Sequence, residues 1–146
     1  LASGGLDKKI IFWEFSSRHF VSQVEFDFSI SKMELAKEAN LLAVSFDDFS
    51  IKIMDFNTRK IVRNLTGKNG TINDFCFNFD ARRLFSAYSD GSLRVWDLPT
   101  GKCVDWIKFN EPVTSLASSL TGQFICTTHQ NSLGISIWSD RSYYEF

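Results

Sequence analysis

The stretch SDGSLRVWD, residues 89–97, opens with a turn and closes on a Trp-Asp pair. Asp90 suits the turn because its carboxylate can accept hydrogen bonds from backbone N–H groups, and the Gly that follows tolerates a positive φ. Residues 92–96 then have the composition of a short strand. Taken alone, the stretch predicts one arm of a β-hairpin.

Nearly the same pattern recurs along the whole chain. Four two-residue anchors stand 41, 42 and 42 residues apart: Trp13-Glu14, Met54-Asp55, Trp96-Asp97 and Trp138-Ser139. An acidic residue stands six positions before each of the first three anchors: Asp7, Asp48 and Asp90. Asn131 stands seven positions before the fourth, so that turn is one residue longer. Self-similarity at a fixed period indicates a repeat architecture.

Each repeat has the pattern of four short strands, and the third shows it best. We expect strands at residues 72–78, 84–88, 92–96 and 102–109, with turns between them. The apolar runs 41–46 and 84–88 are nearly continuous, which is typical of strands covered on both faces, whereas 60–65 is more polar. A further strand is expected at 133–138. Small antiparallel sheets stacked face to face predict an all-β fold of the β-propeller type.

The period divides the chain into about three and a half four-stranded antiparallel blades. The expected units are residues 1–26 (the end of one blade), 27–65, 66–109 and 110–146, the last with a truncated outer strand. Because a propeller closes with roughly four to eight blades, we expect a fragment of a larger propeller. Its end sheets should expose apolar faces, so the fragment is expected to self-associate.

Composition narrows the class of function. Hydrophobic residues make up 44% of the chain, and the formal net charge is −1, so no overall field favours nucleic acid or an anionic membrane. Three cysteines without C-x-x-C spacing indicate neither a disulfide framework nor a zinc site. No apolar run approaches the ~18 residues of a membrane span, so no membrane partner is expected.

The repeat resembles the WD-repeat family in its period, its turn Asp, its Trp-Asp pair and the turn that follows. The resemblance implies structural pins, side chains that hold each blade together: Asp7, Trp13, Asp48, Asp55, Ser86, Asp90, Trp96, Asp97 and Trp138. In WD repeats the turn Asp joins a buried network with a strand Ser, the Trp and a His from a Gly-His pair. Ser86 and Trp96 match, but Gly67 is followed by Lys68, so a complete network is not expected here.

Two longer stretches resemble one branch of that family. They are DDFSIKIMDFNTRKIVRNLTGKNGTINDFCFN (residues 47–78) and THQNSLGISIW (residues 128–138). The branch is the tandem-propeller WD-repeat subunit of the small-subunit processome, part of the UTP-B assembly in the U-three small nucleolar ribonucleoprotein. The resemblance implies a nucleolar, non-catalytic scaffold in pre-rRNA processing and 18S rRNA maturation. It also implies other processome proteins as partners, with pre-rRNA or small nucleolar RNA contacted indirectly or through local basic patches.

Catalytic, cofactor and metal sites are not expected. His19 falls in a turn and His129 at a strand end, and neither has a convincing Ser or Asp partner in the sequence. Asp48 and Asp55 could suggest cation ligands, but their positions in the repeat explain them.

Candidate interaction residues fall on both rims and on an outer strand. Lys68 and Asn69 share a rim with the Asp48 and Asp90 turns. Arg82 and Arg83 lie on the opposite rim, where they either contact RNA phosphate or form a solvated turn. Trp106, on an outer strand, is either a protein-contact hot spot or packs against a neighbouring blade. A second function stays open: a WD-repeat adaptor that binds a peptide or protein on its rim.

Overall fold

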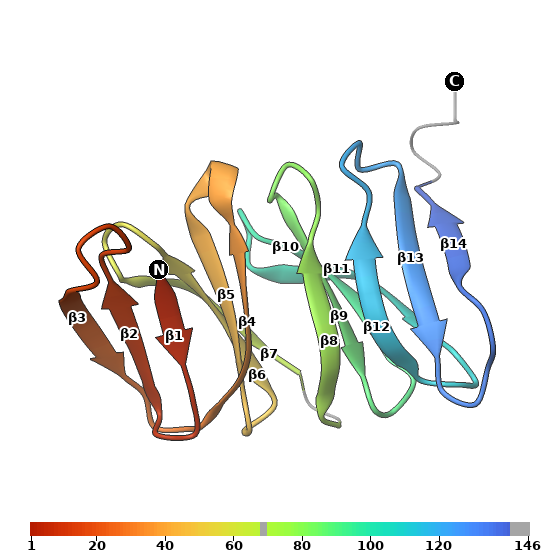
Figure 1. Ribbon diagram of the computed structural model, residues 1–146. Helices are drawn as coiled ribbons and strands as arrows, with labels where there is room; N and C mark the ends of the chain where they lie inside the picture. Colours follow the sequence, from red (N-terminus) through yellow and green to blue (C-terminus); the bar gives the residue numbers. More distant parts are fainter. Residues whose placement is uncertain (68–69, 141–146) are drawn as a thin grey trace.

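The computed structural model describes residues 1–67 and 70–140 and places four antiparallel sheets side by side (Figure 1). The first sheet contains β1 (Ala2–Gly4), β2 (Lys9–Trp13) and β3 (Phe20–Glu25). The second contains β4 (Ile30–Ala36), β5 (Leu41–Phe46), β6 (Ser50–Asp55) and β7 (Ile61–Thr66). A single turn of 3-10 helix, Lys37–Ala39, joins β4 to β5.

The third and fourth sheets repeat this arrangement. The third contains β8 (Ile72–Phe77), β9 (Arg83–Tyr88), β10 (Ser92–Asp97) and β11 (Lys102–Lys108). The fourth contains β12 (Val113–Ser118), β13 (Phe124–His129) and β14 (Ser136–Ser139). In every sheet, strands consecutive in the chain are neighbours in space. The prediction of an all-β fold of stacked antiparallel sheets, a partial propeller, is confirmed.

One predicted strand begins later than expected. The pattern predicted a strand over 133–138, whereas β14 begins at Ser136. Asn131 has φ 56° and Gly134 has φ 107°, and a backbone with positive φ cannot continue a strand. The longer turn of the fourth repeat therefore uses residues that the sequence had assigned to the strand.

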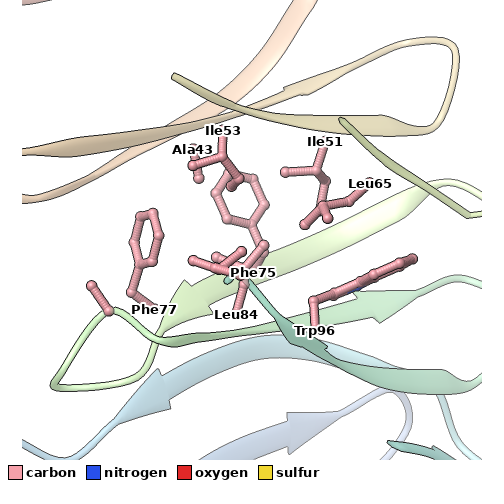
Figure 2. Close-up of a cluster of buried hydrophobic side chains, with 10 residues drawn as sticks. Ala43, Ile51, Ile53, Leu65, Phe75, Phe77, Leu84 and Trp96 are labelled. Carbon is pink, nitrogen blue, oxygen red and sulfur yellow. The ribbon is translucent and has the colours of Figure 1, made fainter. Parts of the chain in front are cut away.

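The core lies between the sheets. In the cluster between the second and third sheets, Ile51, Ile53 and Leu65 face Phe75 and Trp96 (Figure 2). A second cluster joins the first and second sheets, and a third joins the third and fourth. Each sheet therefore depends on its neighbours for burial, because the two faces of a complete sheet belong to two different clusters.

The same irregularity recurs in three of the sheets. Pairing with the next strand shifts by one residue between Ile30 and Lys32 in β4, between Ile72 and Asp74 in β8, and between Val113 and Ser115 in β12. A β-bulge turns the following side chain to a new direction. The bulges place Lys32, Asp74 and Ser115 at equivalent positions of neighbouring sheets.

Candidate functional site

The turn acids hold the hairpins that precede the Trp-Asp anchors. The Oδ1 atom of Asp90 accepts hydrogen bonds from the Ser92 backbone N–H at 2.9 Å and from the Ser92 hydroxyl at 2.6 Å. Asp48 makes the same two bonds with Ser50, at 3.1 and 2.6 Å. Asp7 accepts one longer bond of 3.4 Å from the Lys9 N–H. These carboxylates satisfy backbone donors that a tight turn leaves without a strand partner.

The acids of the anchors hold the next turn. The Asp55 carboxylate accepts from the N–H groups of Asn57 at 2.9 Å and Thr58 at 2.8 Å. Asp97 accepts from the Thr100 hydroxyl at 2.6 Å and from its N–H at 3.1 Å. The backbone bond from Thr58 is the main reason why the pKa of Asp55 lies below its ordinary value, and the Thr100 hydroxyl has the same effect on the pKa of Asp97. Both side chains are therefore stabilised in their ionised form by the hydrogen bonds that they accept within the turn that follows them.

The anchor tryptophans donate their indole N–H to a hydroxyl on the neighbouring strand. Trp96 donates to Ser86 at 2.8 Å, inside the core, and the Ser86 hydroxyl continues to the Tyr88 hydroxyl at 3.4 Å. Trp13 makes the equivalent bond to Ser3 at 2.9 Å. The indole N–H is a donor that needs a partner once it is buried.

The fourth sheet extends this chain of hydrogen bonds by one member. Trp138 donates to Thr127 at 2.9 Å, Thr127 lies 2.8 Å from His129 Nε2, and His129 Nδ1 lies 2.9 Å from the Glu111 carbonyl. A carbonyl only accepts, so Nδ1 carries a proton and donates it to the Glu111 carbonyl. This chain lacks the Gly-His pair of WD repeats, and in the fourth sheet the imidazole of His129 takes part in the network instead.

The second sheet replaces the whole network by apolar side chains. Met54 stands where the other sheets have Trp, and Val44 and Phe46 stand where the third sheet has Ser86 and Tyr88. All three are buried. Since Met has no N–H, a hydroxyl acceptor beside it would have no use, and a buried unsatisfied polar group is costly. The second sheet thus lacks both the indole donor and its hydroxyl acceptor, whereas the first sheet keeps this pair as Trp13 and Ser3 and has Gly5 at the third position.

Sequence reasoning missed the third member of these networks. Tyr88 and His129 each stand two residues beyond the hydroxyl residue, on the same strand and so on the same face. The available signal was the alternation Ser-x-Tyr and Thr-x-His at one position of the repeat. We propose that the predicted pins hold the blades through these bonds, and the stability experiments in the Discussion test that role.

Asp74 is a second residue that the sequence did not single out. It is 6% exposed on β8 and touches both neighbouring sheets. Its carboxylate binds the Lys32 ammonium group from β4, and accepts from the Leu116 N–H at 2.7 Å and the Ser115 hydroxyl at 3.0 Å from β12. Burial by itself would raise the pKa of Asp74, but these bonds lower it below the ordinary value.

The structure does not gather the candidate interaction residues into one site. Lys68 and Asn69 lie outside the described residues. Arg82 and Arg83 are exposed at the β8–β9 turn, where Arg83 Nη1 lies 3.3 Å from a carboxylate oxygen of Asp140. Trp106 lies apart from them on β11 and is 59% exposed, so neighbouring sheets do not bury it.

Two groups with catalytic chemistry, the Thr127 hydroxyl and the Cys76 thiol, are enclosed by the fold. Thr127 is only 1% exposed and already receives the Trp138 indole, so its hydroxyl is closed to a substrate beside His129. Burial raises the pKa of the Cys76 thiol to about 12, which keeps it protonated. Within residues 1–67 and 70–140, no cluster of three or more His, Cys, Asp or Glu is placed to hold a metal ion. In the same residues, none of the helices is long and apolar enough to cross a membrane.

The family model "WDR36/Utp21 second beta-propeller domain" matches residues 1–146. Human WD repeat-containing protein 36 is 39% identical over 140 residues, which cover 96% of this chain and 16% of that protein. U3 small nucleolar RNA-associated protein 21 homolog of Schizosaccharomyces pombe is 37% identical over 145 residues, 99% of this chain and 16% of that protein.

A third relative extends the comparison. U3 small nucleolar RNA-associated protein 21 of Saccharomyces cerevisiae is 34% identical over 145 residues, 99% of this chain and 15% of that protein. The chain thus spans about one sixth of the length of these curated relatives. The period of the anchors, the stacked antiparallel sheets and the match along the whole chain agree: the chain belongs to the WDR36/Utp21 second β-propeller domain family.

Proposed function

We propose that this chain is a non-catalytic scaffold segment of a nucleolar small-subunit processome protein, which supports pre-rRNA processing and 18S rRNA maturation. The observation that carries the proposal is the family match over residues 1–146, together with two relatives named as U3 small nucleolar RNA-associated proteins. The proposal places the protein in the nucleus and nucleolus. Its partners there are other processome proteins.

The use of the polar groups supports a scaffold. The hydroxyl groups of Ser86 and Thr127, the imidazole of His129 and the carboxylate of Asp74 are engaged by neighbouring side chains and backbone. A catalytic site needs such groups at a cleft with room for a substrate. What this chain offers to other molecules is its rims and the outer strands of its sheets.

Depletion of the full-length protein from cells tests the proposal. We expect 18S rRNA to fall and unprocessed precursor to accumulate, and both to recover when the wild-type protein is restored. The tagged protein should also co-purify with processome proteins and U3 small nucleolar RNA. Normal 18S rRNA levels after depletion would refute the processing role. Recovery of a single peptide ligand without processome components would instead support the adaptor function.

A further inference from the structure

We propose that one face of β10–β11, formed by Trp106, Arg94 and Lys108, binds single-stranded RNA. The choice of RNA rests on the proposed function, and the surface itself is identified by the structure. We call these three residues the β11 patch.

The strand register brings the three side chains to one face. Trp106 in β11 stands directly opposite Arg94 in β10, and directly opposed residues of an antiparallel pair project from the same face about 5 Å apart. Lys108 lies two residues beyond Trp106 on β11 and so projects from that face too. Trp106 is 59% exposed and Lys108 is exposed, so both are open to a ligand.

The indole is not explained by packing. At the equivalent places, opposite Lys52 in β6 and opposite Ile11 in β2, the second and first sheets carry Asn64 and Gln23. These sheets pair their outer strands without an aromatic residue there. Because the sister sheets have amides at this place, the fold itself does not require an aromatic ring there.

The charge of the patch is positive. In the described part of the chain, neither Arg94 nor Lys108 forms a salt bridge. The Arg94 guanidinium lies 5.0 Å from the centre of the Tyr88 ring, which orients it without neutralising it. Asp90 interacts electrostatically with both Lys108 and Arg94, and its Oδ1 already accepts hydrogen bonds from Ser92.

An exposed indole beside two cations fits a nucleic acid strand. A base can stack on the ring, and adjacent phosphates can contact the cations. An apolar peptide is less well supported, because the nearby aliphatic residue Ile107 is opposite Leu93 and lines the groove on the other face of the sheet. Val104 is the extra residue of the bulge between the pairs Val95–Asp105 and Trp96–Cys103.

The test is binding of a fluorescent single-stranded oligouridine to the full-length protein at several salt concentrations. W106A should weaken binding about 5–150-fold, the factor equivalent to ~1–3 kcal/mol per stacked base. K108Q should reduce the slope of log K against log salt by about 0.7, the value for one phosphate contact on a single strand. K102Q, on the same exposed strand but four residues from Trp106, is the matched control and should change neither quantity. An unfolding curve for W106A that matches wild type ensures that lost binding is not lost structure.

The outcomes separate the patch from the scaffold function. If W106A and K108Q bind oligouridine as wild type does, the patch proposal is overturned, whatever depletion does to 18S rRNA. If polyglutamate competes as well as oligouridine and W106A weakens both equally, the patch binds acidic peptide and the RNA proposal fails. If depletion leaves 18S rRNA normal while W106A and K108Q behave as expected, the patch stands and the processing function fails.

Discussion

The indole N–H of the anchor tryptophan determines which side chains can surround it. Trp96 has Ser86 and Tyr88 beside it, whereas Met54 has Val44 and Phe46. The polar set gives the Trp96 N–H an acceptor, and the apolar set has no side-chain donor that needs one. The indole and its hydroxyl partner are thus best regarded as a pair that is kept or replaced together.

Replacing Trp96 with alanine should cost about 3–5 kcal/mol of unfolding free energy, because it removes a large side chain from the core between two sheets. Trp106→Ala is the matched control: it removes the same atoms from an exposed position and should cost far less. Urea unfolding of both variants measures the difference. Equal losses of unfolding free energy in the two variants would show that burial of the indole does not determine its contribution to stability.

Ser86→Val should be destabilising by about 1–3 kcal/mol, because it leaves the Trp96 N–H without an acceptor. The same change in a Trp96→Met background should cost less, since methionine has no N–H to satisfy. The two backgrounds form a double-mutant cycle with an expected coupling of about 0.5–3 kcal/mol. Additive effects within experimental error would show that the need for the Ser86 hydroxyl does not depend on the Trp96 N–H.

At the scale of elements, the carboxylate of Asp74 in β8 forms hydrogen bonds to the second and fourth sheets and so connects them to the third. Asp74 reaches Lys32 in β4 and Leu116 in β12, and the repeated β-bulge puts these residues at its side. The first strands of the second, third and fourth sheets, β4, β8 and β12, are therefore joined by polar contacts in addition to the apolar clusters between the sheets.

Asp74→Asn should lower the unfolding free energy by about 1–3 kcal/mol at pH 7. The folded-state pKa of Asp74 is lowered, so its contribution is present above the ordinary aspartate pKa of about 3.9 and is lost as pH falls through the folded value. The gap between wild type and Asp74→Asn should therefore shrink between pH 7 and pH 3. Burial raises the pKa of nearby Glu34, with the opposite effect on stability, and the charge of Asp74 adds to this rise, so Asp74→Asn also lessens the Glu34 effect.

Denaturation at several pH values measures this gap. Asp27→Asn, an exposed aspartate on the loop between β3 and β4, is the control and should stay close to wild type throughout. A gap for Asp74→Asn that does not change with pH would mean that the carboxylate is not the source of the stability.

At the scale of the molecule, every sheet is stabilised by its neighbours, and the two outermost faces have none among the described residues. Ile135, Ile137 and Leu133 are exposed on the fourth sheet and its preceding turn, and Leu6 and Phe15 on the turns of the first. Apolar surface of this kind favours association.

Residues 1–146 prepared alone should self-associate. The apparent mass from light scattering should rise with protein concentration. An Ile135→Lys, Ile137→Lys double variant should shift the equilibrium toward monomer, because it places charge on the exposed strand β14 and on the residue just before it. A stable monomer of the unsubstituted chain at high concentration would contradict this expectation.

The sequence by itself determined the all-β class, the period of the sheets and the places of the anchors, because hairpin strands and turns are set by residues close together in the chain. It also put Ser86 and Trp96 at matching positions, and their side chains meet. Only the tertiary structure decided that Tyr88 and His129 complete the networks, that Asp74 joins three sheets and that Arg94 lies beside Trp106. The contacts of Asp74 and Arg94 depend on strand register and on bulges, which bring together residues far apart in the chain. Tyr88 and His129 lie only two residues from their hydroxyl partners, and their role depends on where the indole of the neighbouring strand is placed. The stretch 89–97 therefore predicted its own hairpin and its repeats, but not the partners that its side chains would meet.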